Sequence, residues 1–302
     1  MPELPEVETI RRQLAPLVEG RTLARVEVLD GRWSRPLLPE ELSGAMTGRQ
    51  VLALGRRGKY LVWELAGEVF VAQHLRMTGT VLCDPLPEPL HTRVRITLGG
   101  PCEGPVVDRL CLVDPRRFGT GELLLGHEAM EAFFARRLGL EPFDPGFTVE
   151  HLRALARGRH APIKAFLLDQ RRIAGIGNIY ADEALYRASL HPLRPVGRLT
   201  AAEWTRLREA VIGALQAGID AHGATIDDFR HVDGVYGSFQ NEFLVHRRAG
   251  QACPGCGGPI VKIVAAGRGT YLCETCQPRR GRRQGASSSS RRPLAAAAAI
   301  SV

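Results

Sequence analysis

The chain begins Met1-Pro2-Glu3, and removal of Met1 would leave a secondary amine beside a carboxylate. An α-amino group has a pKa of about 7.7–8.0, so part of it is uncharged at neutral pH. A proline nitrogen that attacks a sugar C1′ becomes an iminium cation, which accepts electrons from the neighbouring carbon. Glu3 would be placed to move protons in such a reaction. The same residues are also typical of a helix start, because proline and acidic side chains favour the first helical turn.

Four cysteines near the end of the chain have the spacing of a zinc site. Cys253 and Cys256 form one CxxC pair, and Cys273 and Cys276 form a second after sixteen residues. Four thiolates at this spacing hold one structural Zn²⁺ in a closed tetrahedral shell. A redox or disulfide pair is the alternative, less favoured in a cytosolic chain. The residues between the pairs predict a β-hairpin, and Arg268, between two glycines at its expected tip, could contact a phosphate.

A glycine-rich turn lies in the most basic part of the globular chain. Residues 151–200 carry nine basic and three acidic side chains, and within them Gly175 and Gly177 precede Asn178. Asn178 is predicted to cap a helix that begins near Ile179, whose free N–H groups would bind a phosphate. A dinucleotide-binding turn is excluded, since a third glycine and a βαβ context are missing. The pattern favours a helix–turn–helix that contacts a nucleic-acid backbone, although a tight interhelical turn is compatible with it.

Two cores are expected to position these residues. Strand-like segments separated by Gly, Pro and Asp dominate up to residue 113 and predict a β-sandwich or barrel, whereas helical periodicity prevails from residue 148. The Pro/Gly-rich stretch 140–148 marks the boundary. We therefore predict four regions, an N-terminal catalytic β-sandwich domain at 1–140, a helical DNA-binding domain at 141–245, a zinc finger at 246–277 and a basic low-complexity tail at 278–302.

The net charge of +8 is concentrated in that tail. Six arginines and no acid lie in residues 277–302, so the rest of the chain carries 34 basic and 32 acidic side chains. A cationic tail suggests a polyanionic partner. No apolar run approaches the about 20 residues of a membrane helix, and the charged start lacks a signal-peptide core. We therefore expect a cytoplasmic protein without a membrane partner.

Six motifs in order show a resemblance to a known family. They are Pro-Glu-Leu-Pro-Glu-Val-Glu-Thr at 2–9, Arg-Arg-Gly-Lys-Tyr at 56–60, His-Leu-Arg-Met-Thr-Gly at 74–79, Asp-Pro-Arg-Arg-Phe-Gly at 114–119, Gly-Ile-Gly-Asn-Ile-Tyr-Ala-Asp-Glu at 175–183, and the cysteine quartet. With them the chain resembles the bacterial formamidopyrimidine-DNA glycosylases over residues 1–277. The resemblance implies an α+β fold, with an N-terminal β-sandwich flanked by helices and a C-terminal helix-two-turn-helix domain carrying a zinc-ribbon hairpin.

The resemblance also implies an activity and its residues. Members are bifunctional repair enzymes that remove 8-oxoguanine and formamidopyrimidines from double-stranded DNA and cut the abasic site by β,δ-elimination. Pro2 would be the Schiff-base nucleophile, Glu3 the acid/base at the sugar, Lys59 the proton donor in β-elimination and a phosphate contact, and Arg268 an aid to δ-elimination. DNA-binding positions would be His74, His91, Arg116, Arg159 and Asn178, with Met77, Arg116 and Phe118 as the wedge that replaces the extruded nucleotide. A monomer is expected.

The chain departs from the family pattern in places. Val245-His246-Arg247-Arg248 stands where members carry Val-Tyr-Gly-Arg, and Arg76 replaces a glycine found in many members. The tail has no inherited role, and we hypothesise that its arginines add DNA affinity by counterion release.

Two other functions remain open. One is an endonuclease VIII-like glycosylase for oxidised pyrimidines, against which Leu4 and the loop 233–240 argue. The other is a non-catalytic zinc protein that binds damaged DNA, against which Pro2, Glu3 and Lys59 argue.

Overall fold

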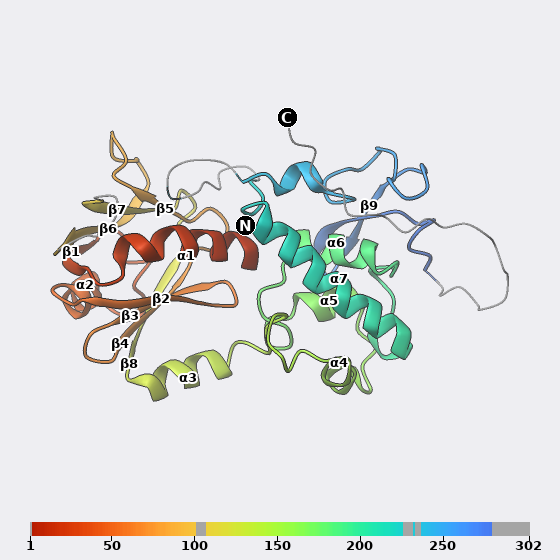
Figure 1. The fold of residues 1–302 in the computed structure, drawn as a ribbon, viewed down its shortest axis with the longest axis horizontal. Coiled ribbons are helices and arrows are strands. Elements are labelled where there is room, and N and C mark those ends of the chain that lie inside the picture. Colours follow the sequence, from red (N-terminus) through yellow and green to blue (C-terminus); the bar gives the residue numbers. More distant parts are fainter. Residues whose placement is uncertain (1, 101–106, 226–231, 233–236, 280–302) are drawn as a thin grey trace.

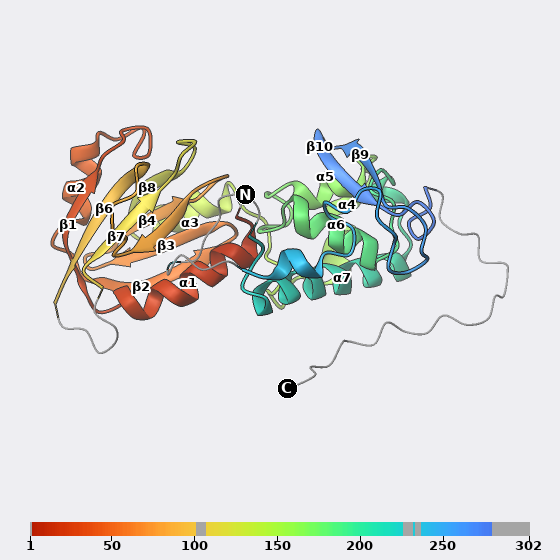
Figure 2. The ribbon, with the colours of Figure 1, turned by 90° about the horizontal axis from the view of Figure 1, so that it is seen from above.

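The computed structural model describes residues 2–100, 107–225, 232 and 237–279. Within these ranges the chain forms two bodies side by side, one rich in strands and one rich in helices (Figures 1 and 2). Each body has its own large hydrophobic cluster. The predicted α+β class is confirmed, and the start of the first helix lies at the junction between the bodies.

The strand-rich body is a sandwich of two four-stranded antiparallel sheets. Side chains of β6 alternate between buried and half-buried, as expected when one face of a strand packs on a core. All six residues of β4 are buried, because the sandwich core covers one face and the aromatic side chains of helix α3 cover the other. One sheet contains β1 (Thr22–Val28), β6 (Thr92–Gly99), β7 (Arg109–Val113) and β5 (Thr80–Cys83), and the other contains β2 (Val51–Arg57), β3 (Tyr60–Leu65), β4 (Val69–His74) and β8 (Thr120–Leu125).

Three helices accompany the sandwich, namely α1 (Leu4–Val18), α2 (Pro39–Met46) and α3 (His127–Ala135). Helix α1 packs Val7, Ile10 and Leu14 into the sandwich core, at the spacing of one helical face. Its first residue, Leu4, instead belongs to the core of the helical body. Helix α1 therefore joins the two cores and brings the chain start to their boundary.

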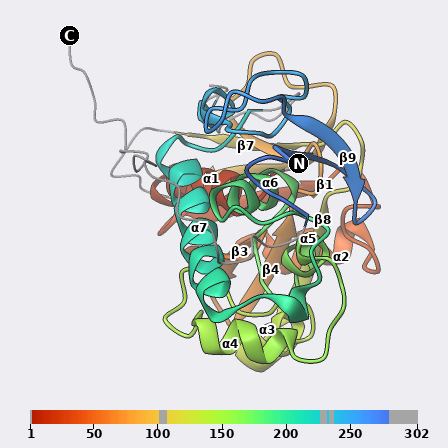
Figure 3. The same cartoon turned by 90° about the vertical axis from the view of Figure 1, so that its right-hand side faces the viewer.

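The helical body is built around α7 (Ala201–Asp220), which lies alongside α6 (Asn178–Arg187) (Figure 3). Thr200 and Glu203 form a capping box at the start of α7. The other elements are α4 (Val149–Ala156), α5 (Ile163–Leu168), the short 3₁₀ turns η1 (Val196–Arg198) and η2 (Phe239–Glu242), and a hairpin of β9 (Val261–Ala265) and β10 (Arg268–Leu272). In the described part of the chain no helix has the length and apolarity needed to cross a membrane.

Candidate active site

Glu3 is held at the junction by two helix starts. It is buried directly before α1, and its backbone N–H donates to Glu6 Oε2 at 2.8 Å. Its carboxylate accepts hydrogen bonds from the backbone N–H groups of Ile179 at 2.9 Å and Tyr180 at 3.4 Å, at the start of α6. A carboxylate at a helix N-terminus also interacts favourably with the helix dipole. Pro2 is buried beside Glu3, while Met1 lies outside the described residues.

This arrangement corrects the prediction for the glycine turn. Gly177, not Asn178, is the N-cap residue of α6, and the predicted phosphate-binding N–H groups of the helix donate to Glu3. A Cβ at Gly175 would lie 2.9 Å from the Cβ of Leu4, and one at Gly177 would overlap the Glu3 carboxyl. The glycines therefore leave room for the N-terminal residues of the chain.

Lys59 lies in the turn between β2 and β3 and is only 5% exposed. Its Nζ donates to the carbonyl oxygen of Ile176 at 2.9 Å, in the same glycine turn. Burial lowers the pKa of Lys59, the positive charge of Arg268 lowers it further, and the nearby carboxylate of Glu3 opposes both effects. A lysine with a lowered pKa can give up a proton more readily near neutral pH.

Glu6 is a second buried carboxyl that the sequence did not single out. It accepts hydrogen bonds from the Tyr180 hydroxyl at 2.7 Å and from the Ala224 backbone N–H at 2.8 Å. Burial raises the pKa of Glu6, and the charge of Glu3 raises it further. Its position three residues after Glu3 matches a capping box, a signal that does not separate a buried acid from a surface one.

Arg268 is the first residue of β10 and is exposed, with Ala266 and Gly267 in the turn before it at positive φ. The predicted place at the hairpin tip is confirmed. Asn178 Nδ2 donates to the carbonyl oxygen of Gly269 at 3.0 Å, which ties the start of α6 to this hairpin. The structure thus brings Pro2, Glu3, Lys59, Asn178 and Arg268 together from four segments of the chain.

The proposed wedge residues project from two adjacent loops of the sandwich. Met77 is 42% exposed and Phe118 is 49% exposed, so both large apolar side chains reach the solvent. The Arg116 guanidinium lies 4.9 Å above the centre of the Phe118 ring. The pair presents an exposed cationic and aromatic surface.

Asp114 holds the two loops together, and the sequence did not identify it. Its buried carboxylate accepts hydrogen bonds from the Thr78 hydroxyl at 2.5 Å and from the backbone N–H of Phe118 at 2.8 Å. The backbone N–H of Asp114 donates to the carbonyl oxygen of His91 at 3.0 Å, so His91 adjoins the same loops.

Arg159 lies on the helical body, where its Nε donates to the carbonyl oxygen of Leu155 at 2.8 Å.

His74 ends β4 and is uncharged. Its Nδ1 accepts a hydrogen bond from the Arg76 backbone N–H at 2.9 Å, so the ring proton is on Nε2. Burial and the charges of Arg76 and Lys59 lower the pKa of His74 to about 3. A cavity of about 310 Å³ opens here, with Lys59 and His74 in its wall, and its lining also contains the basic side chains Arg76, Arg136, Arg137 and Arg171.

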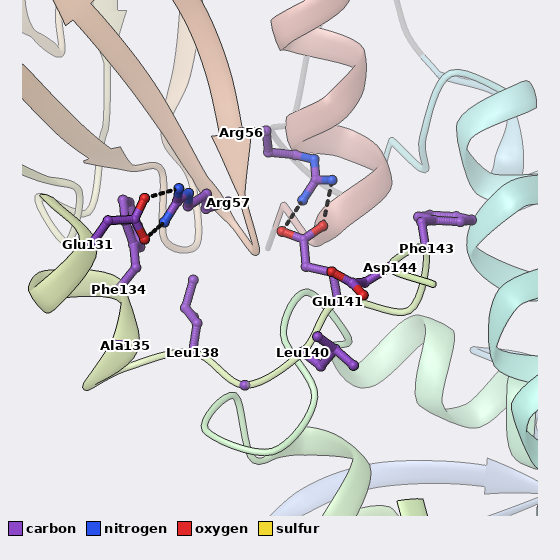
Figure 4. Close-up of a pocket in the computed structure, with 11 residues that line it drawn as sticks. Arg56, Arg57, Glu131, Phe134, Ala135, Leu138, Leu140, Glu141, Phe143 and Asp144 are labelled. Atoms are coloured by element: carbon purple, nitrogen blue, oxygen red, sulfur yellow. Dashed lines mark hydrogen bonds and ion pairs between the residues drawn. The ribbon is translucent and has the colours of Figure 1, made fainter. Parts of the chain in front are cut away.

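A larger cavity of about 550 Å³ lies at the linker between the bodies (Figure 4). Its two arginines from β2 are already paired, Arg56 with Glu141 at 2.7 Å and Arg57 with Glu131. This pairing neutralises the basic groups of the cavity. The cavity contains none of the residues predicted for catalysis or DNA binding.

The four cysteine sulfurs lie within 4.8 Å of one another. Sγ of Cys253 is 3.8 Å from that of Cys276, and Sγ of Cys256 is 3.4 Å from that of Cys273. A tetrahedral zinc with Zn–S bonds of about 2.3 Å requires sulfurs about 3.8 Å apart. The residues therefore fit one Zn²⁺, and a shell of four protein ligands is typical of a structural ion.

Three family models match successive parts of the chain. The model described as Formamidopyrimidine-DNA glycosylase N-terminal domain matches residues 1–121, the Formamidopyrimidine-DNA glycosylase H2TH domain matches 138–230, and the Zinc finger found in FPG and IleRS matches 250–279. A formamidopyrimidine-DNA glycosylase of Thermus thermophilus is 42% identical over 280 residues, covering 92% of this chain and 98% of that protein. That of Bacillus licheniformis is 39% identical over 285 residues, covering 92% and 99%.

Solved structures agree with these matches. The crystal structure of the Thermus thermophilus protein superposes with a TM-score of 0.81 at 41% identity, covering 93% of this chain and all of that chain. A Lactococcus lactis variant in complex with Fapy-dG-containing DNA has a TM-score of 0.84 at 33% identity, covering 92% of this chain and all of that one. AP lyase activity is typical of this family. The chain belongs to the formamidopyrimidine-DNA glycosylase family and is a zinc-finger DNA glycosylase of base-excision repair.

Proposed function

We propose that this enzyme removes oxidised purines, 8-oxoguanine and formamidopyrimidines, from double-stranded DNA and then cuts the abasic site. One observation carries the proposal. Buried Pro2 lies next to a carboxylate, Glu3, that two helix N–H groups hold in place beside the buried ammonium of Lys59. A nucleophile, a fixed acid/base group and a proton donor are the groups that a Schiff-base glycosylase requires.

Base removal begins at the Pro2 nitrogen, after loss of Met1. Its lone pair forms a bond to C1′, and the C1′–N bond breaks with its electrons leaving on the damaged base, which takes up a proton. Ring opening then places a proton on O4′ and gives the iminium. Glu3 is the group we assign to proton transfer at the sugar, because its carboxylate cannot rotate away without losing two hydrogen bonds.

Strand cleavage follows from the iminium. Loss of the C2′ proton supplies electrons that expel the 3′-phosphate, and loss of the C4′ proton then expels the 5′-phosphate. We assign proton donation in the first elimination to Lys59 and charge neutralisation in the second to Arg268. The interaction of Arg268 with the Lys59 ammonium supports this assignment, because it puts both cations at one site.

Access to C1′ requires extrusion of the damaged nucleotide, which costs a few kcal/mol. We propose that Met77 and Phe118 fill the resulting gap with Arg116 beside them, since large apolar wedges offset the loss of stacking. His74, His91, Arg159 and Asn178 are proposed to contact the DNA backbone. The DNA-bound Lactococcus lactis relatives support a duplex with damaged bases as the substrate.

Borohydride trapping tests the chemistry. Wild-type enzyme on an 8-oxoguanine duplex should form a covalent adduct, Pro2→Gly should lose most of it, and an intact-mass measurement should show the N-terminus without Met1. Glu128→Gln, at an exposed acid in the first turn of α3, is the control substitution away from the site and should be trapped like wild type. A wild-type enzyme that cannot be trapped would refute the mechanism and favour a non-catalytic damage-binding protein.

The lesion is tested separately. A Lactococcus lactis relative has been solved with DNA containing an oxidised pyrimidine, so pyrimidine lesions are the competing substrates. The first half of the loop 233–240, which favours the purine branch by sequence, lies outside the described residues. Excision of 8-oxoguanine opposite cytosine should exceed that of dihydrouracil, and the reverse preference would assign the enzyme to pyrimidines.

We also propose that the protein is cytoplasmic and monomeric. Light scattering with and without DNA would check the monomer.

A further inference from the structure

A buried polar network lies behind the hairpin that carries Arg268. Lys164 of α5 and Asp182 of α6 form an ion pair of 2.6 Å between Nζ and Oδ1. Lys164 Nζ also donates to the Thr270 hydroxyl at 2.7 Å, and His246 Nδ1 lies 2.9 Å from Asp182 Oδ2. The side chains of Lys164, Asp182 and Thr270 are completely buried and His246 is 5% exposed. The network joins α5, α6, the segment after η2 and β10.

The network is connected to the backbone of Arg268. The Thr270 hydroxyl, which accepts from Lys164, donates to the carbonyl oxygen of Arg268 at 3.0 Å. The backbone N–H of Tyr271 donates to Asp182 Oδ2 at 3.3 Å. Thus β10 contacts one carboxylate directly through Tyr271 and indirectly through Thr270 and Lys164.

Helix α6 holds both sides of the proposed reaction centre. Its first N–H groups bind the Glu3 carboxylate, and Asp182 follows one turn later on the same helix. Each residue adds about 1.5 Å along a helix, so the Glu3 contact and Asp182 lie only a few ångströms apart along α6. The position of Arg268 relative to Glu3 is therefore set through α6.

Burial of an ion pair is costly, and such pairs add little stability over apolar side chains of similar volume. A buried pair can instead select one arrangement of the elements it joins. In this chain His246 supplies the third partner of the network, in the tetrapeptide that departs from the family pattern. The contacts of Lys164 with Thr270 and of Asp182 with Tyr271 therefore join the hairpin to α5 and α6.

We propose that Lys164, Asp182, His246 and Thr270 are positioning residues that hold Arg268 at the site and thereby determine how far cleavage proceeds from β- to δ-elimination. The proposal rests on the proposed function. In the second elimination the C4′–H bond breaks and its electrons form a carbon–carbon double bond, while the C5′–O bond breaks with its electrons leaving on the phosphate. A cation fixed beside that phosphate stabilises the developing charge.

The test compares Thr270→Val with Thr270→Ser on a duplex containing an abasic site. Valine keeps the shape but removes the hydroxyl between Lys164 and the Arg268 carbonyl, and serine keeps the hydroxyl. We expect Thr270→Val to lower the ratio of δ- to β-elimination product about tenfold, equivalent to about 1.4 kcal/mol of barrier. Thr270→Ser should behave as wild type. Borohydride trapping and one zinc per chain should be unchanged in both variants.

A double-mutant cycle ties the effect to Arg268. Arg268→Ala alone should lose δ-product, and adding Thr270→Val should cause no further fall, because both changes act through one group. Should Thr270→Val prove unstable, His246→Phe replaces it, since phenylalanine can keep the ring contacts with Phe243 and Tyr271 while losing the contact with Asp182.

The results of these experiments distinguish a failure of the positioning role from a failure of the proposed function. A folded Thr270→Val or His246→Phe variant with the wild-type product ratio would overturn the positioning role, and so would an equal fall in trapping and in δ-product. Failure of the wild type to be trapped would instead overturn the proposed function. Additive effects of Thr270→Val and Arg268→Ala would show that Thr270 acts independently of Arg268.

Discussion

At the scale of single residues, burial determines which charges the site can use. Two helix N–H groups donate to the buried carboxyl of Glu3, and burial raises the pKa of Glu6. Lys59 is buried between these acids and Arg268. The site therefore contains closely packed groups that differ in how readily each gives up a proton, which is the arrangement that acid–base catalysis requires.

Lys59→Met should raise stability while it slows β-elimination. Burial lowers the pKa of Lys59, so the folded state binds this proton less tightly than the unfolded state, whose lysine titrates near 10.5. Stability from this group increases as pH rises from the lowered pKa towards 10.5, and below that window the charged lysine destabilises the fold. Ile176 keeps a donor, Gln170 Nε2, at 2.8 Å. We expect Tm at pH 7 to rise by about 2–4 °C and β-elimination to slow.

Calorimetry and a gel assay of abasic-site cleavage check this prediction. Lys262→Met, at an exposed position of β9, is the matched control and should leave both quantities unchanged. A fall in Tm for Lys59→Met would show that the buried ammonium stabilises the fold.

His74 should bind DNA as a neutral donor. Because its pKa is about 3, the His74 ring is uncharged near neutral pH. His74→Gln should therefore weaken DNA binding without changing the slope of log K against log salt. Arg159→Ala, at a proposed backbone contact, should reduce that slope by about 0.9 for one lost phosphate contact. Fluorescence anisotropy across salt concentrations measures both, and a reduced slope for His74→Gln would show a charged histidine.

At the scale of elements, the start of α6 and the start of α1 depend on one glycine. Gly177 has an ordinary φ of −125°, so alanine is acceptable for the backbone, but its Cβ would overlap the Glu3 carboxyl. Gly177→Ala should therefore lower the free energy of unfolding by about 1–3 kcal/mol through overpacking and reduce trapping by displacing Glu3.

Gly44→Ala provides the matched control. Gly44 lies inside α2 with nothing within 4 Å of a built Cβ, so alanine there should stabilise by about 0.5–1 kcal/mol. Urea unfolding of both variants measures the difference. Equal stabilisation by both substitutions would contradict the close contact of Gly177 with Glu3.

The zinc ribbon is the element most dependent on a ligand. Its hydrophobic cluster is small and includes two of the zinc-ligand cysteines, Cys253 and Cys273. Metal-binding free energy in such modules is folding free energy. Chelation should therefore disorder the hairpin, remove Arg268 from the site and suppress δ-elimination, while most of the helical circular-dichroism signal persists. Restored activity on adding Zn²⁺ is the control, and full δ-elimination by zinc-free enzyme would contradict the prediction.

At the scale of the whole molecule, charge is distributed unevenly. Residues 1–276 are close to neutral, and six arginines follow in the tail. Residues 280–302 lie outside the described part of the chain, so the prediction rests on charge alone. Deleting 278–302 should reduce the slope of log K against log salt for DNA binding. The reduction should be up to about 5, because each of the six arginines contributes about 0.9. Replacing the six arginines with glutamine in the full chain separates charge from length, and an unchanged slope would contradict it.

The helical periodicity expected from residue 148 onwards is confirmed by α4, α5, α6 and α7. The spacing of Leu207, Val211, Leu215 and Ile219 on one face predicts α7, because this periodicity is a property of the local sequence. Strands β5 and β8 were not predicted, because they are short and their pairing partners lie far away in the chain. The division at residue 140 stays a prediction.

The sequence by itself determined the family, the four zinc ligands and the candidate groups Pro2, Glu3, Lys59 and Arg268, because these are carried by residue type and order. Only the tertiary structure decided which group caps α6. The sequence predicted Asn178, but Glu3 caps the helix from 176 residues away. The burial of Glu6 and the lowered pKa of Lys59 were likewise unreadable. Desolvation and long-range hydrogen bonds depend on which segments pack together, and no local spacing encodes that.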